Sequence, residues 1–113
     1  MDCKEELFSF LMKMKSKSVV VEGKRDEKAL KDFGFTDIQV LNRANGIFDA
    51  SEKLPGDVLI LTDFDAEGEK IAKKLRVVLV KMGKIADNKD RKVLRRLFLK
   101  NKINTIEGLK KLF

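Results

Sequence analysis

The chain has 113 residues, of which 43% are hydrophobic, and a formal net charge of +7; this size suits one core, so we expect residues 1–113 to form a single domain. One cysteine and no histidine exclude an internal disulfide, a zinc finger and Ser-His or Cys-His catalysis. The sequence has neither a signal-peptide pattern nor an apolar run near the roughly 20 residues that span a bilayer, so we expect a cytoplasmic protein without a membrane partner.

Short apolar runs alternate with amphipathic helical patterns along the chain. The apolar runs predict strands at residues 19–21, 38–41 and 58–61, with a short fourth at 84–86. Helical periodicity predicts helices over 3–15, 25–33, 47–53, 68–82, around 93–98, and over 106–112 with Thr105 as the N-cap. Residues 76–80 alone could also form a strand. The alternation implies βαβ crossovers and an α/β fold, with a central parallel sheet of about four short strands flanked by helices.

Acidic residues follow two of the predicted strands. Glu22 comes directly after strand 19–21, and Asp63 and Asp65 come directly after strand 58–61. Extended backbone points Asp63 and Asp65 to the same side, and parallel sheets bind ligands outside the carboxyl ends of their strands. Two such carboxylates repel unless a cation compensates, and hard oxygen ligands favour Mg²⁺ or Mn²⁺. The pair therefore predicts a divalent metal site, which Glu22 joins if the two strands are neighbours.

In a chain without histidine, Glu22 is the best candidate for a general acid or base. Gly23 lets the backbone or a phosphate come close, and a bound metal neutralises charge that develops on phosphoryl oxygens. The expected chemistry is Mg²⁺-dependent phosphoryl transfer, with Glu22, Asp63 and Asp65 as the catalytic residues.

The two motifs together resemble the Toprim family, in which a hydrophobic strand ending in Glu-Gly is followed farther along by a strand ending in Asp-x-Asp-x-x-Gly-Glu. That family includes topoisomerases, bacterial-type primases, nucleases and the ribonucleases that mature 5S ribosomal RNA. The resemblance implies a Rossmann-like α/β fold, an acid/base role for Glu22, and Mg²⁺ ligation by Asp63 and Asp65. It covers about residues 18–87 and leaves 88–113 as a helical extension.

Local details separate this chain from some branches of the family. Val-Glu22-Gly23-Lys24-x-Asp26 and Gly68-Glu69-Lys70-Ile71 are similar to the maturation ribonucleases and to small stand-alone Toprim proteins. Phe64 stands where proline is often found, and Ala66 where topoisomerases usually have arginine. The chain has no tyrosine, so it cannot hold a cleaved strand as topoisomerases do, and we expect it to lack the further modules of a complete primase.

Acids at predicted helix starts admit two interpretations. Glu67 and Glu69 can be stabilised by the helix macrodipole alone, or they can contribute to the metal site. Asp26 has the same alternatives, and the family pattern favours a metal role for it. Gly68 belongs to the same motif, and Asn45-Gly46 shapes either a substrate loop or a plain turn.

Positive charge gathers toward the end of the chain. Residues 1–72 carry 11 basic and 15 acidic groups, whereas residues 73–113 carry 14 basic and 3 acidic groups. An acidic region beside a basic one suits a metal site that faces a polyanion, so we expect RNA or DNA as the partner. A lysine-rich solvated surface, as in heat-adapted proteins, is the alternative.

The phosphate-contact candidates flank the predicted crevice or lie on the helix that follows it. They are Lys24, Arg25, Arg43, Lys70 and Arg95, the last on a helix face shared with Arg91, Lys92 and Arg96. As ordinary exposed charges they would need no explanation. Few exposed aromatic residues are expected, so the sequence gives little support for base stacking.

The leading hypothesis is a Toprim-class nuclease, a hydrolase of RNA or DNA that acts in processes such as RNA processing. The alternative is a non-catalytic nucleic-acid-binding module or subunit, with a protein partner that performs the chemistry. An interaction protein that binds neither metal nor nucleic acid is a third possibility.

Overall fold

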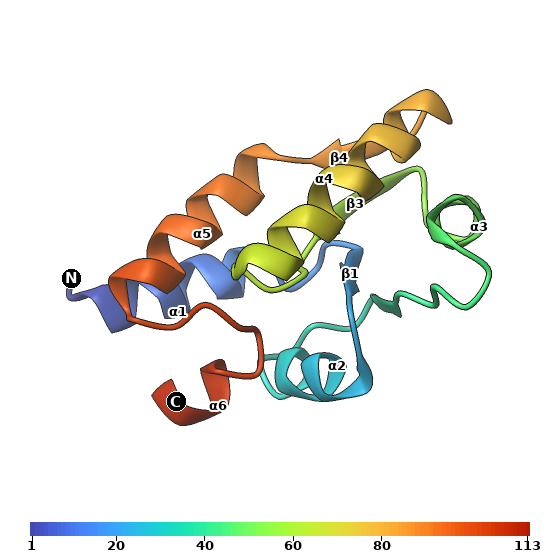
Figure 1. Cartoon of the computed structure of the whole chain (residues 1–113). Coiled ribbons are helices and arrows are strands. Elements are labelled where there is room, and N and C mark those ends of the chain that lie inside the picture. Colours follow the sequence, from blue (N-terminus) through green and yellow to red (C-terminus); the bar gives the residue numbers. More distant parts are fainter.

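A four-stranded parallel sheet with helices on both faces organises the chain. The computed structural model describes all residues, 1–113. The strands are β1 (Val19–Val21), β2 (Ile38–Val40), β3 (Asp57–Ile60) and β4 (Ile85–Asp87), in the spatial order β2-β1-β3-β4 (Figure 1). All three strand pairs are parallel. The predicted α/β fold and its four short strands are confirmed.

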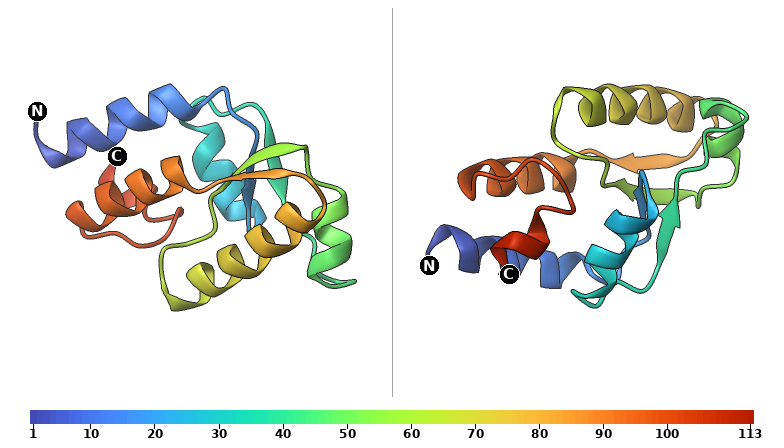
Figure 2. Two further views of the ribbon diagram at one scale, coloured as in Figure 1. Left: turned by 90° about the horizontal axis from the view of Figure 1, so that it is seen from above. Right: turned by 60° about the horizontal axis from the view of Figure 1, so that its bottom comes forward.

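Six helices surround the sheet. They are α1 (Cys3–Met14), α2 (Lys24–Lys31), α3 (Ile47–Glu52), α4 (Ala66–Lys81), α5 (Lys89–Lys100) and α6 (Leu109–Leu112). Residues 76–80 are helical, within α4. Figure 2 shows α4, in yellow and gold, on one side of the sheet and α1 and α2, in blue and cyan, on the other. None of the helices has both the length and the apolar content that crossing a membrane requires.

Side-chain alternation in the central strands divides the core into two clusters. One cluster contains Val19, Val21, Leu59 and Leu61 together with buried residues of α1, α2, α5 and α6. The other contains Val20, Val58 and Ile60 together with buried residues of α3 and α4. Successive strand residues point to opposite faces, so an uninterrupted apolar run is what a strand covered on both faces requires.

The last helix is shorter than predicted. We expected it to span 106–112 with Thr105 as its N-cap, but α6 contains only Leu109–Leu112. The Thr105 hydroxyl does accept a hydrogen bond from the Gly108 N–H (3.1 Å), but it stabilises a turn that precedes the helix. The N–H of Ile106 instead donates to the side chain of Asp63 (2.9 Å), so tertiary contacts override the local helical pattern.

The side chain of Lys84 connects the start of β4 to the end of α3. Its Nζ donates to the carbonyl oxygens of Ser51 (2.8 Å), Glu52 (2.9 Å) and Leu54 (2.7 Å). The last carbonyls of a helix have no partner within the helix, and a cation at that end also interacts favourably with the helix dipole. Lys84 therefore holds α3 against the edge of the sheet.

Replacing Lys84 by methionine should lower the free energy of unfolding by about 1–3 kcal/mol, because three carbonyls lose a charged donor while the apolar stem is retained. Urea denaturation followed by circular dichroism measures the change. Lys81→Met, at an exposed position of α4, is the control; equal stability of the two variants would contradict the role assigned to Lys84.

Candidate functional site

The predicted acidic residues lie outside the carboxyl ends of the two central strands. Val20 of β1 pairs with Ile60 of β3, and the Leu61 N–H donates to the Val20 carbonyl (2.8 Å). Glu22 directly follows β1, and Asp63 lies three residues beyond the end of β3. The strand order reverses between β1 and β3, which is where parallel sheets form their ligand-binding crevice.

Four acidic side chains at this edge of the sheet form an acidic cluster, which we define as Glu22, Asp26, Asp63 and Asp65; we call the surface that they border the crevice. Burial raises the pKa of Glu22, and the charge of Asp63 raises it further, with smaller contributions from Asp26 and Asp65. Burial, followed by the charge of Asp63, raises the pKa of Asp26 to about 6. Burial also raises the pKa of Asp63, against the hydrogen bond from Ile106. The fold therefore holds negative charges close together.

Hydrogen bonds fix some of these carboxylate oxygens and leave others available. Asp65 is the N-cap of α4, and its Oδ1 accepts from the Gly68 N–H (2.8 Å). Asp63 Oδ1 accepts from the Ile106 N–H (2.9 Å). Glu22 Oε1 is buried and has no hydrogen-bond partner. A buried oxygen without a partner is costly, so Glu22 is the clearest position for a ligand to contact.

The acidic cluster is better suited to a hydrated cation than to a cation whose ligands all come from the protein. No three acidic or cysteine side chains lie close enough together to form a ready-made metal cluster. Mg²⁺ commonly takes only one or two carboxylates and keeps several waters, so this spacing suits it. Divalent charge would also offset the repulsion that raises the pKa values of Glu22, Asp26 and Asp63.

Arg91 contradicts its predicted role. We placed it on a phosphate-tracking helix face, but its side chain is only 1% exposed. Its guanidinium donates to the carbonyls of Ile60 (2.8 Å), Thr62 (3.0 Å) and Asp63 (3.2 Å) and lies over the ring of Phe64, 4.7 Å from the centroid. Arg91 therefore supports the β3–α4 connection from the protein interior, where phosphates cannot reach it.

Glu69 balances the charge of this buried arginine. Its carboxylate accepts a hydrogen bond from Arg91 and lies 2.6 Å from Arg95 Nε. Burial alone would raise the pKa of Glu69, but the ion pairs with Arg95 and Arg91 bring it below its ordinary value. Both oxygens of Glu69 are thus committed to arginines, and Arg95, a predicted nucleic-acid contact, is partly engaged at the same position.

Gly68 is required by close backbone contact. A Cβ at this position would lie 2.0 Å from the carbonyl oxygen of Asp63. The buried Thr62 hydroxyl donates to the Gly68 carbonyl (2.7 Å). The first turn of α4 therefore packs directly on the loop that carries Asp63 and Asp65, and only glycine permits this approach.

The remaining predicted residues are exposed. Glu67 is exposed in the first turn of α4, Lys24 and Arg25 begin α2, and Arg43 follows β2, while Lys70 is exposed on α4. Arg25 is 86% exposed and lies 4.0 Å from Glu107.

Two other glycines of the predicted site, Gly23 and Gly46, differ in whether their backbone conformation favours glycine. Gly23 has extended backbone, and a Cβ there would meet open space. Gly46 has φ +94°, a conformation that favours glycine, and it precedes α3.

The C-terminal segment contributes more to the crevice than the sequence indicated. The Phe64 N–H donates to the Asn104 carbonyl (2.7 Å). The charge of Glu107 raises the pKa values of Asp26 and Asp63, whereas Lys110 lowers that of Asp26. The sequence did contain one signal for this role, because Glu107 is an isolated acid in a basic region. The other two acids after residue 72, Asp87 and Asp90, both pair with Lys17.

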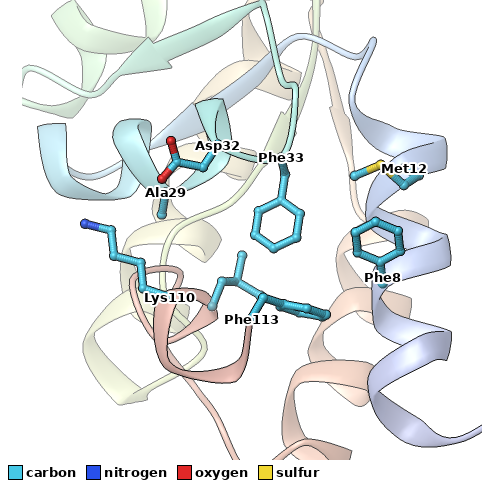
Figure 3. A pocket seen from close by; sticks show the side chains of 8 residues that line it. Phe8, Met12, Ala29, Asp32, Phe33, Lys110 and Phe113 are labelled. Carbon is cyan, nitrogen blue, oxygen red and sulfur yellow. The ribbon is translucent and has the colours of Figure 1, made fainter.

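A separate cavity of about 490 Å³ lies between α1, α2 and α6. Figure 3 shows Phe8, Phe33 and Phe113 lining it, with Asp32 and Lys110 as its polar side chains. The aromatic rings contact one another, with centroids 5.1 to 6.1 Å apart. This lining lacks the grouped carboxylates of the crevice, so we do not assign phosphate chemistry to it.

Comparisons with known proteins bear on the family and the fold of the chain. The family model described as Toprim domain matches residues 17–102. A UPF0292 protein of Pyrococcus furiosus is 46% identical over 71 residues, covering 59% of this chain and 53% of the relative, or about half its length. A UPF0292 protein of Thermococcus onnurineus is 38% identical over 109 residues, covering 93% of this chain and 79% of the relative. A solved structure from Aquifex aeolicus has a TM-score of 0.69 and 30% identity, covering 92% of this chain and 95% of that one.

Substituting alanine for Gly68 should lower the free energy of unfolding by about 3 kcal/mol, because the Asp63 backbone must move to admit a methyl group. Thermal or urea unfolding measures the loss. Gly56→Ala is the matched control, since its Cβ would meet nothing within 4 Å. Equal stability of the two variants would show that the close approach is not required.

The carboxyl of Asp26 should titrate near pH 6 in the metal-free protein. Because its pKa is higher in the folded chain than in the unfolded one, the fold takes up a proton as the pH falls from about 6 to about 4, and this group stabilises the fold more at acidic than at neutral pH. NMR of the side-chain carboxyl measures the pKa. Asp63→Asn should lower it, whereas Asp49→Asn should not; no effect of Asp63→Asn would contradict the coupling.

Proposed function

Because the chain belongs to the Toprim domain family, whose members bind Mg²⁺ and process nucleic acids, we propose that it is a Mg²⁺-dependent nuclease. The observation that carries the proposal is the position of Glu22 and Asp63 at the ends of adjacent strands, with raised pKa values and a buried Glu22 oxygen that has no partner. These features suit a divalent cation, which Glu22 and Asp63 would help to hold and which would supply positive charge near a phosphate.

Asp63 would hold the cation, with Asp26 and Asp65 placed to contact its water shell. A cation bound there supplies positive charge to the phosphoryl oxygens as the phosphodiester reacts. Mn²⁺ would suit the same oxygen ligands. The loop that carries Asp63 and Asp65 is fixed by Arg91 and Gly68, so these carboxylates need little reorganisation when the cation binds.

Glu22 would act as the general acid or base. Burial and the charge of Asp63 raise its pKa, so its carboxyl can hold and release a proton closer to neutral pH than an exposed glutamate can. The open space at Gly23 leaves room for a phosphate beside Glu22. Lys24 and Arg25 are exposed at the start of α2 and add positive charge on that side.

A second candidate function is a nucleic-acid-binding module without its own catalysis. The observation that favours it is the lack of a ready-made cluster of three metal-binding side chains, together with the hydrogen bonds that already occupy one oxygen of Asp63 and one of Asp65. Such a module would position phosphates while a partner protein performs the reaction. It would show salt-sensitive binding without turnover.

Incubation with end-labelled RNA and DNA, single- and double-stranded, in Mg²⁺ or Mn²⁺ tests the nuclease. We expect cleavage that EDTA abolishes and that Asp63→Asn or Glu22→Gln slows by about 10² to 10⁴-fold, as expected for loss of a catalytic group. Asp57→Asn is the matched control, because Asp57 is exposed at the opposite end of β3.

Cleavage that persists unchanged in Asp63→Asn would contradict the site assignment. Metal-independent binding that weakens with salt, without cleavage of any of the four substrates, would instead support the binding module.

A further inference from the structure

A shallow groove of about 550 Å³ lies between α3 and α4. It is lined by three lysines and three aliphatic residues: Lys70, Lys73, Lys74, Ile47, Val77 and Val78. Of these, only Lys70 was among the phosphate contacts expected from the sequence. Figure 2 shows α3, in green, beside α4, in yellow and gold.

The three lysines carry charge that nothing in the protein neutralises. All three are exposed, and none lies within ion-pair distance of a carboxylate, whereas Arg91, Arg95 and Lys17 all do. Residues three and four positions apart on a helix are neighbours, with Cβ atoms about 5–6 Å apart, so the ammonium groups form one cationic edge. This edge is complementary to a phosphodiester backbone.

The rest of the groove is apolar. Ile47, Val77 and Val78 contribute aliphatic surface, and lysine stems characteristically cover such surface while their charged ends remain in water. The next residue of α3, Phe48, is 63% exposed but does not line the groove. Cations beside a flat apolar surface suit bases and phosphates together.

The groove runs along α4, away from the acidic cluster. Asp65 caps α4, and Lys70 lies just past the first turn of that helix, with Lys73 and Lys74 about one turn farther on. With a rise of about 1.5 Å per residue, a strand lying along these lysines would run from the crevice along α4.

We propose that this groove binds a single-stranded segment of nucleic acid, with its phosphates on the lysines and its bases on the aliphatic surface of Ile47, Val77 and Val78. The proposal rests on the function proposed above and adds the form of the substrate. A duplex would satisfy the lysines but keeps its base faces stacked inside, so the apolar part of the groove selects unpaired nucleotides.

Fluorescence anisotropy tests the proposal in EDTA, where cleavage does not interfere. The probes are a labelled single strand of mixed sequence and a hairpin duplex of equal phosphate number. Replacing Lys70, Lys73 and Lys74 together by glutamine should weaken single-strand binding about tenfold or more and reduce the salt slope by about 2. The control replaces Lys13, Lys28 and Lys89, which are exposed and outside the ion pairs, and removes the same charge.

A second pair of variants tests the contact with bases. Val77→Ser should weaken single-strand binding about threefold or more and leave duplex binding nearly unchanged, because it removes apolar surface that only unpaired bases can contact. Phe48→Ser, outside the groove lining, is the control and should preserve binding. Val77 and Phe48 are 46% and 63% exposed, so both variants should retain the unfolding temperature of the parent chain.

The outcomes separate this proposal from the proposed function. Equal losses in the two triple-lysine variants, or a preference for the hairpin, would overturn the groove while leaving Asp63-dependent cleavage intact. Binding of an acidic peptide or of anionic vesicles in place of the single strand would also overturn it. If the groove variants lose single-strand binding but no substrate is cleaved, the result supports binding by the groove and contradicts the proposed nuclease activity.

Discussion

The buried guanidinium of Arg91 fixes the segment on which the site depends. It donates to carbonyls at the end of β3 and in the loop beyond, while Glu69 balances its charge. A buried charge is tolerated only when it is paired and its donors are satisfied. The same short loop must fit against Gly68, so the path of the chain between β3 and α4 has little freedom. That path fixes the positions of Asp63 and Asp65.

Against this fixed loop, the fold maintains an unfavourable grouping of negative charge. Burial raises the pKa values of Glu22, Asp26 and Asp63, and their mutual repulsion adds to the effect. Natural chains retain such groupings chiefly at functional sites. The lysines of the α3–α4 groove are a complementary feature, since they are unpaired cations outside the crevice. Together the two surfaces suit a ligand that carries repeated negative charge.

The parts of the fold that follow from local patterns were predictable. The Val19–Val21 run predicted a strand buried on both faces, and the apolar face of α4 predicted a helix. The positions of Glu22 and Asp63 at strand ends followed from parallel-sheet geometry. The structural features that the sequence could not reveal depend on contacts between residues far apart in the chain. Arg91 has the local pattern of a surface arginine, and its burial depends on carbonyls about 30 residues earlier; likewise, Ile106 leaves a helical pattern because its N–H binds Asp63.

Mn²⁺ titration followed by NMR tests the central claim, that the crevice holds a divalent cation, most directly. Substoichiometric Mn²⁺ should first broaden the amide resonances of Glu22, Gly23, Asp63 and Phe64, and excess Mg²⁺ should restore them. Asp63→Asn should remove this selectivity. Broadening that is spread equally over exposed acids such as Asp32 and Asp57, or that is absent at millimolar Mn²⁺, would contradict the account.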